Sequence, residues 1–176
     1  YAGRGPVQVA ARDRTDGVRE IQDLLEGAVR RKANVDCQLA DGLPAILADP
    51  IQIQQVLMNL VVNAAESADA AVDVRIETKA IEITENDIRE LVPGSPLKSG
   101  HGVALDVTDN GAGMDAETMN QMFEPFFTTR DPDKGTGLGL SVAKTIVEDC
   151  GGEIEIESTP NVGTTVKLFF PKISNE

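Results

Sequence analysis

The chain is poor in cysteine, histidine and aromatic residues, with two Cys, one His, one Tyr and no Trp among 176 residues. Cys37 and Cys150 fall in separate predicted elements, and two such residues form neither a disulfide framework nor a zinc site. We expect buried or incidental thiols. His101 occurs in a Ser-Gly-His-Gly turn without an adjacent carboxylate, which is typical of an exposed loop residue and not of a phosphate acceptor.

Positive charge and long apolar runs are also scarce. The chain has 16 Lys and Arg against 29 Asp and Glu, a formal net charge of −13. This charge excludes a nucleic-acid or anionic-membrane surface, because phosphate backbones are held mainly by clustered Lys and Arg. No apolar run approaches the ~20 residues of a membrane span, and the N-terminus lacks the plan of a signal peptide. We therefore expect a cytoplasmic domain that contacts no membrane and no nucleic acid.

Apolar residues make up 41% of the chain, which is enough for one ordinary hydrophobic core. Residues 1–14 carry Gly, Pro and Arg without periodicity and predict a linker, so the domain itself should span 15–176. Helical and alternating patterns mix without strict alternation, which favours the α+β class. The expected helices span 15–32, 49–68, 116–122 and 138–149, with a short helix and loop over 85–102. The expected strands span 35–39, 72–83, 103–107, 154–156 and 164–170.

Two asparagines one helical turn apart, Asn59 and Asn63, mark the second expected helix. The Asn63 side chain offers a neutral oxygen, a reasonable ligand for Mg²⁺ when phosphates and waters supply the other positions. Asn59 cannot take a proton at neutral pH, whereas a water-splitting ATPase needs a carboxylate base near the terminal phosphate. This favours a kinase over an ATPase. For Glu66, three residues later, we expect a surface or structural role.

Asp109 begins the segment Asp-Asn-Gly-Ala-Gly, which ends at Gly113. Gly111 and Gly113 allow the backbone to approach a planar base closely, and an ionised carboxylate only accepts hydrogen bonds. Such a carboxylate suits the amino group of adenine and disfavours the carbonyl of guanine. A loop with tight turns is the alternative for this motif alone.

A second glycine-rich run, Gly135-Thr136-Gly137-Leu138-Gly139-Leu140, opens the last expected helix. No strand directly precedes it and it is no Walker loop, so it indicates a helix N-terminus that favours phosphate oxygens. Residues 123–136 before it have little regular pattern and form a candidate lid. Phe123, Phe126 and Phe127 should anchor that lid. The lid residues expected to reach a nucleotide are Phe127, Thr128, Thr129, Arg130 and Lys134, with Arg130 suited to forked phosphate contacts.

Taken in order, these motifs resemble those of sensor histidine kinases. Residues 59–64 resemble the N box, 109–113 the first glycine box, 123–127 the F box, 135–140 the second glycine box and 163–165 the glycine-threonine motif. The resemblance covers roughly residues 16–171. It implies a Bergerat, or GHKL, two-layer α/β sandwich: a mixed, mainly antiparallel sheet with helices on one face.

The resemblance also implies an ATP-binding catalytic domain that uses Mg²⁺, with Asn63 as metal ligand and Asp109 as adenine partner. ATP would phosphorylate a histidine on separate dimerising helices, and the phosphoryl group would pass to an aspartate of a response-regulator receiver domain. From the residues and the resemblance together, we expect Asn59 and Arg130 as catalytic residues. The expected nucleotide contacts are Asn59, Asn63, Asp109, Gly111, Gly113, Phe127, Thr128, Thr129, Arg130, Lys134, Gly135, Thr136, Gly137, Leu138, Gly139, Leu140 and Thr165.

The sequence departs from the family in one respect, because no histidine acceptor motif precedes residue 16. We expect residues 1–14 to lead from absent helices that carry it, this piece alone to be a monomer, and the parent protein to be a homodimer. Two alternatives stay open: an ATPase of the same superfamily acting as a conformational switch, and a nucleotide-binding signalling module without catalysis.

Overall fold

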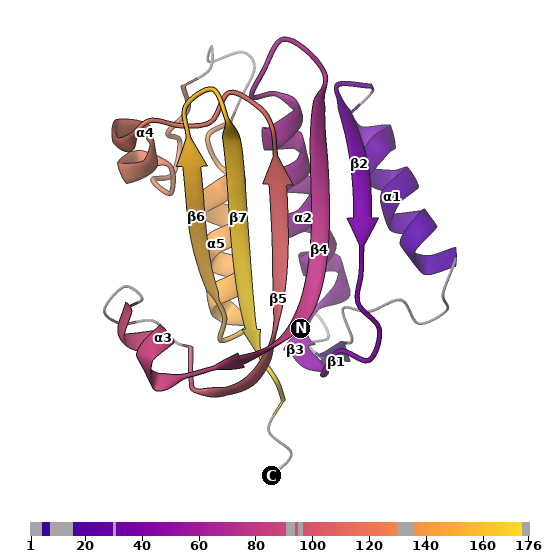
Figure 1. The fold of residues 1–176 in the computed structure, drawn as a ribbon, viewed down its shortest axis with the longest axis vertical. Coiled ribbons are helices and arrows are strands. Elements are labelled where there is room, and N and C mark those ends of the chain that lie inside the picture. Colours follow the sequence, from indigo (N-terminus) through magenta and orange to yellow (C-terminus); the bar gives the residue numbers. More distant parts are fainter. Residues whose placement is uncertain are drawn as a thin grey trace.

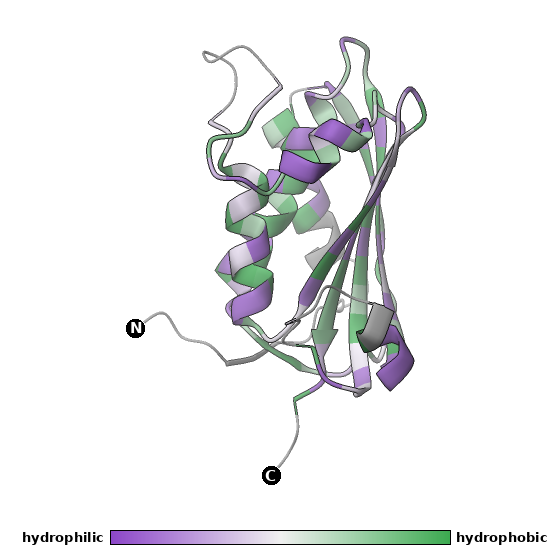
Figure 2. Cartoon of the chain, turned by 90° about the vertical axis from the view of Figure 1, so that its left-hand side faces the viewer, coloured by the Kyte–Doolittle hydropathy of each residue, from purple (hydrophilic) through white to green (hydrophobic). Residues whose placement is uncertain are grey.

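The fold is a five-stranded sheet covered on one face by helices, as predicted (Figures 1 and 2). The computed structural model describes residues 5–7, 16–29, 31–90, 94, 97–129 and 136–173. Its strand order is β2-β4-β5-β7-β6, with β2 parallel to β4 and every other pair antiparallel. The strands are β2 (Ala33–Gln38), β4 (Val72–Ile83), β5 (Gly100–Asp109), β6 (Glu153–Thr159) and β7 (Gly163–Pro171).

Three helices form the second layer, and two short ones lie outside it (Figure 1). The N-terminus of α2 is fixed by Asp49, whose carboxylate accepts the Ile51 N–H at 2.9 Å, and by Pro50, which needs no hydrogen-bond acceptor there. Among the described residues, no helix is both long enough and apolar enough to cross a bilayer. The helices are α1 (Asp16–Val29), α2 (Pro50–Ala65), α3 (Glu85–Glu90), α4 (Ala116–Gln121) and α5 (Gly139–Asp149).

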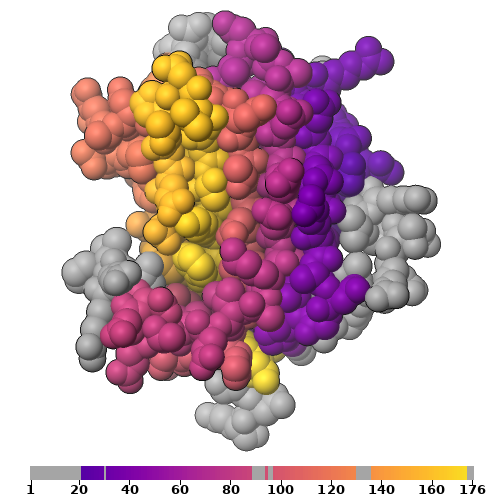
Figure 3. Space-filling model, viewed as in Figure 1, coloured from indigo at the N-terminus to yellow at the C-terminus, as the bar shows by residue number. Residues whose placement is uncertain are grey.

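The core lies between the helices and the sheet. Alternation in β4 buries Val74 and Ile76, while Arg75 between them is exposed. Phe170 of β7 is fully buried in the same layer. The opposite face of the sheet, seen in Figure 3, carries ion pairs such as Lys79–Asp106 at 2.8 Å. The sheet therefore has one face for the core and one for solvent.

A second, two-stranded sheet differs from the prediction. Residues 1–14 are predicted as a linker, but Gly5–Val7 forms β1, which pairs antiparallel with β3 (Ile46–Ala48). The remaining residues of that segment lie outside the described part of the chain. Strand β5 also begins at Gly100, three residues before its first apolar position, because its pairing with β4 extends that far. Short or polar strand segments lack the alternation on which the prediction depends.

Cys37 lies in β2 and packs, partly buried, against the core, which agrees with the expectation of a buried thiol. Burial, and then the charges of Asp36 and Glu26, raise the pKa of the Cys37 thiol to about 11. At pH 8 its thiolate fraction should be roughly 100-fold below that of an unperturbed cysteine, so iodoacetamide should label it correspondingly slowly. Mass spectrometry of timed digests, with the urea-unfolded chain as control, measures this. Labelling at the unfolded rate would contradict it.

Candidate functional site

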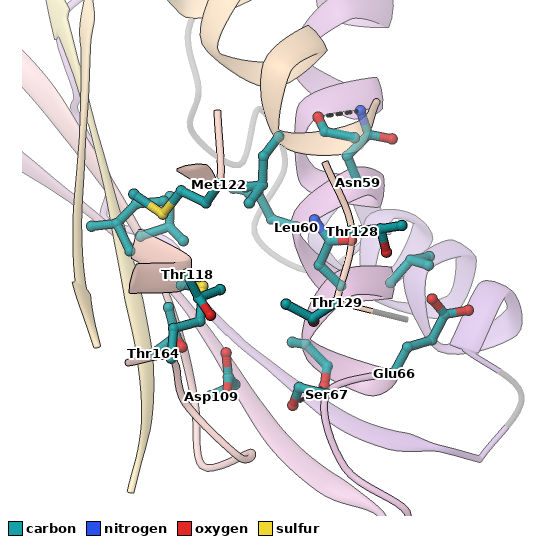
Figure 4. A pocket seen from close by; sticks show the side chains of 18 of the residues that line it. Asn59, Leu60, Glu66, Ser67, Asp109, Thr118, Met122, Thr128, Thr129 and Thr164 are labelled. Atoms are coloured by element: carbon teal, nitrogen blue, oxygen red, sulfur yellow. Dashed lines mark hydrogen bonds between the residues drawn. The ribbon is translucent and has the colours of Figure 1, made fainter. Parts of the chain in front are cut away.

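A cavity of about 830 Å³ opens between the helices and one end of the sheet (Figure 4). Its helical wall comes from α2 and the start of α5, and its sheet wall from the end of β5 and the facing positions of β6 and β7. The cavity is lined by Asn59, Leu60, Val62, Asn63, Ala64, Glu66, Ser67, Asp109, Ala112, Gly113, Met114, Thr118, Met122, Phe127, Thr128, Thr129, Thr136, Gly137, Gly139, Leu140, Ile156, Thr164 and Val166.

Asp109 is the last residue of β5, and its side chain points into the cavity (Figure 4). Its Oδ1 accepts the Gly111 backbone N–H at 2.8 Å. Burial raises the pKa of Asp109 above its ordinary value, while backbone hydrogen bonds from Gly111 and Thr164 oppose that rise. A partly desolvated carboxylate with fixed orientation is thus available to a ligand that donates a hydrogen bond.

Two glycines next to Asp109 are required by close packing. A Cβ on Gly111 would overlap the Ser67 side chain, and one on Gly113 would overlap the Thr159 carbonyl. Gly113 also has a backbone φ of +66°, which residues other than glycine rarely adopt. The first glycine motif therefore shapes the turn that carries the polypeptide around Asp109.

The two asparagines of α2 meet the start of α5. Asn59 Nδ2 donates to the Gly139 carbonyl at 3.2 Å, drawn as a dashed line in Figure 4. A Cβ on Gly139 would lie 3.5 Å from Asn63 Nδ2, so the second glycine motif sits directly against this face. Leu138 stands at the N-cap of α5 and makes no side-chain cap hydrogen bond there. Amides at a helix N-terminus are suited to an anion, and the glycine run predicts that role here.

The segment between α4 and α5 is held at both ends. The Phe126 N–H donates to the Gly137 carbonyl at 2.9 Å, and Gly137 has a φ of +65°. Phe123 packs against the core with the Lys144 ammonium 4.8 Å from its ring centre, which agrees with an anchoring role. Phe126 is different: its side chain is 74% exposed, so the prediction that it anchors the lid is wrong.

Most of the predicted site residues that the structure describes line this one cavity. Gly111 adjoins it through its bond to Asp109, whereas Leu138 stands at the N-cap of α5, outside the lining. Arg130, Lys134 and Gly135 lie outside the described residues. The binding roles themselves stay predictions.

Thr165, one of the predicted nucleotide contacts, lies outside the cavity lining. Strand pleating turns it to the outer face, where its Oγ1 lies 3.1 Å from Thr108 Oγ1, and the adjacent Thr164 lines the cavity. The apolar alternation of Val166, Leu168 and Phe170 is the signal that identifies the inward face of β7.

Several lining residues were not predicted from sequence. Glu66, expected at the surface, is exposed and also borders the cavity. Ser67 follows α2 without any local pattern that marks it. Among the described residues, no group of three or more His, Cys, Asp or Glu could hold a metal ion.

The chain is similar to known proteins in sequence and in fold. The family model described as histidine kinase-, DNA gyrase B- and HSP90-like ATPase matches residues 48–174. Sensor kinase CckA of Brucella abortus is 31% identical over 176 residues, which are 100% of this chain and 18% of that protein. Sensor histidine kinase ZraS of Escherichia coli K12 is 34% identical over 151 residues, 86% of this chain and 28% of that protein.

A solved structure is also similar over most of its length. The catalytic domain of histidine kinase ThkA has a TM-score of 0.65 and 29% identity, covering 88% of this chain and 90% of that chain. The chain thus spans less than a third of the curated relatives it matches, whereas it spans nearly all of an isolated catalytic domain.

Proposed function

This chain belongs to the histidine kinase-, DNA gyrase B- and HSP90-like ATPase family, and we propose that it is the ATP-binding catalytic domain of a sensor histidine kinase. Sensor kinases among its relatives and the likeness to the ThkA catalytic domain support this. The observation that carries most weight is the arrangement of one cavity with Asp109 on the sheet wall and Asn63 on the helix wall.

In the proposed complex, Asp109 accepts a hydrogen bond from the adenine amino group. The Thr118 and Met122 side chains, one helical turn apart, and Ile156 supply the polar and aliphatic surface around the base. This fits the absence of Trp and the single Tyr in the chain. A carboxylate at this position disfavours guanine, whose carbonyl would face a second acceptor.

The triphosphate then extends toward Asn63 and the start of α5. The Asn63 side-chain oxygen is suited to a Mg²⁺ ion that also binds the phosphates, and Mg²⁺ supplies charge neutralisation there. The backbone amides at the N-terminus of α5, which begins at Gly139, are suited to bind phosphate oxygens. Arg130 and Lys134 belong to the same segment of sequence and remain predicted phosphate contacts.

The reaction proposed is transfer of the terminal phosphoryl group to a histidine on a separate helical domain. A histidine nitrogen attacks the γ-phosphorus, the N–P bond forms, and the bond to the β-phosphate oxygen breaks, leaving ADP. Asn59 cannot deprotonate water, and its side chain is already hydrogen-bonded to the Gly139 carbonyl. Asn59 therefore supplies no base that would activate water as a competing nucleophile. A response-regulator aspartate is the proposed final acceptor.

The test mixes this chain with radiolabelled ATP, Mg²⁺ and the histidine-bearing helical hairpin of a sensor histidine kinase relative. We expect acid-labile label on the hairpin and none on this chain alone. Steady phosphate release without the hairpin would instead indicate a conformational ATPase. Failure to bind nucleotide at millimolar Mg²⁺ would indicate a signalling module of another kind.

The proposal also predicts a pH dependence of ATP binding. The ionised Asp109 accepts a stronger, charge-assisted hydrogen bond from the adenine amino group than the protonated acid does, and burial raises the pKa of Asp109. The affinity for ATP should be highest at pH values above that raised pKa and should fall as the pH drops through it. The fall should begin at a higher pH than the ordinary carboxylate pKa of about 4 would give. Calorimetry between about pH 7.5 and 5 measures this. The phosphates of ATP titrate in the same range, and subtracting the pH profile of ATP affinity of the Asp109→Asn variant removes their contribution. Identical pH profiles for the wild-type chain and this variant would contradict the prediction.

A further inference from the structure

Ser67 presents a hydrogen-bond acceptor to the cavity from the turn that ends α2. Its hydroxyl lies 2.8 Å from the Ala64 carbonyl oxygen, which also accepts the Ser67 backbone N–H at 3.0 Å. A carbonyl has no proton, so the hydroxyl must be the donor in this bond. The hydrogen of Ser67 is thereby engaged, and the lone pairs of its oxygen are what it offers to a ligand.

Ser67 and Asp109 crowd the same backbone position from two elements. A Cβ on Gly111 would overlap Ser67 Oγ and would also lie 2.9 Å from Asp109 Oδ1. In Figure 4 the two side chains stand next to each other at one end of the cavity. Two acceptors from separate elements, the α2 turn and the end of β5, therefore face the same small region.

Two neighbouring acceptors are complementary to a group with two donor hydrogens. We propose that Ser67 accepts the second N–H of the adenine amino group, beside the one that Asp109 accepts, so that the pair selects a primary amino group. This inference rests on the proposed function and specifies its base selectivity. A guanine or hypoxanthine carbonyl would meet two acceptors in place of one, and an alkylated amino group would lose one of the two bonds.

The experiment compares ATP with N6-methyl-ATP on the wild-type chain and on Ser67→Ala, by calorimetry with Mg²⁺. The methylated base keeps one N–H for Asp109 and turns its methyl group toward Ser67. We expect wild type to bind N6-methyl-ATP about 2- to 12-fold more weakly than ATP, the range of one neutral hydrogen bond. In Ser67→Ala the two nucleotides should bind within about twofold of each other, because that bond is already absent.

Ser67→Thr keeps the hydroxyl and should keep the wild-type discrimination, which separates loss of the acceptor from a general disturbance of the turn. Equal discrimination in wild type and Ser67→Ala, with ATP still bound, would overturn the role of Ser67 and leave the proposed function standing. A wild-type chain that binds no ATP would overturn both.

Discussion

An Asp109→Asn variant should bind ATP roughly 5- to 150-fold more weakly than the wild-type chain. That range corresponds to the ~1–3 kcal/mol of a hydrogen bond to a charged, partly buried group. Asparagine has the same shape and its oxygen can still accept the Gly111 N–H, so the turn should persist. Its amide nitrogen, however, is a donor facing the donor hydrogens of the base. Titration calorimetry with Mg·ATP measures the change, and thermal unfolding checks the fold.

The matched control is Asp36→Asn, which removes a carboxylate from the exposed outer face of the sheet, where it pairs with Arg75 at 3.7 Å. It changes the net charge equally but lies outside the cavity lining. We expect its ATP affinity to stay within about twofold of wild type, since exposed ion pairs contribute little. If both variants bind equally, or if Asp109→Asn binds as tightly as wild type, Asp109 is no part of the base pocket.

A Gly137→Ala variant should lose at least about tenfold in ATP affinity, because two effects act at this residue. Its φ of +65° disfavours any side chain by ~1–2 kcal/mol. A Cβ there would also lie 2.6 Å from the Phe126 carbonyl oxygen, and backbone cannot move aside cheaply. The contact between the two ends of the candidate lid would have to open, displacing Thr136 and Gly137 from the cavity wall.

Gly42→Ala is a close control for this variant. Gly42 has a φ of +69°, and nothing lies within 4 Å of a Cβ added there. It lies in a turn outside the cavity lining, so it shares the conformational penalty without the clash. We expect Gly42→Ala to lower the unfolding temperature by a few degrees and leave ATP affinity unchanged. Equal losses of affinity in the two variants would contradict a specific role for the contact at Phe126.

Sequence patterns predict the long elements of this fold well. The alternation from Val72 to Ile83 predicts β4 with the bounds that it has, because twelve residues of inward and outward positions leave little ambiguity. In α2, Leu57, Leu60, Val61, Ala64 and Ala65 recur at the helical period, and all five are buried. Strands β1 and β3 could not be predicted in this way, because three residues each show no period and their pairing is a property of the tertiary fold.

In the candidate site too, some residues can be predicted from local sequence and others depend on the tertiary fold. Local motifs predict Asp109, Asn59 and Asn63, since their chemistry and spacing are visible in sequence. Ser67 enters the cavity only because α2 ends next to Gly111, a relation between segments more than forty residues apart. Of the adjacent Thr164 and Thr165, only Thr164 lines the cavity, and only the inward or outward direction of each strand position distinguishes them.

The sheet wall of the cavity has a kinetic consequence. Of the groups proposed to hold the base, Asp109 and Ile156 stand on β5 and β6, which both pair with β7, and Ser67, Thr118 and Met122 lie beside them. The groups proposed for the phosphates stand at a helix start and in a loop. In the proposed complex, ADP would keep all of the contacts to its purine after the γ-phosphoryl group has left. ADP should therefore compete strongly with fresh substrate, and the ratio of the two nucleotides, more than the total amount, would set how often this domain is ready to act.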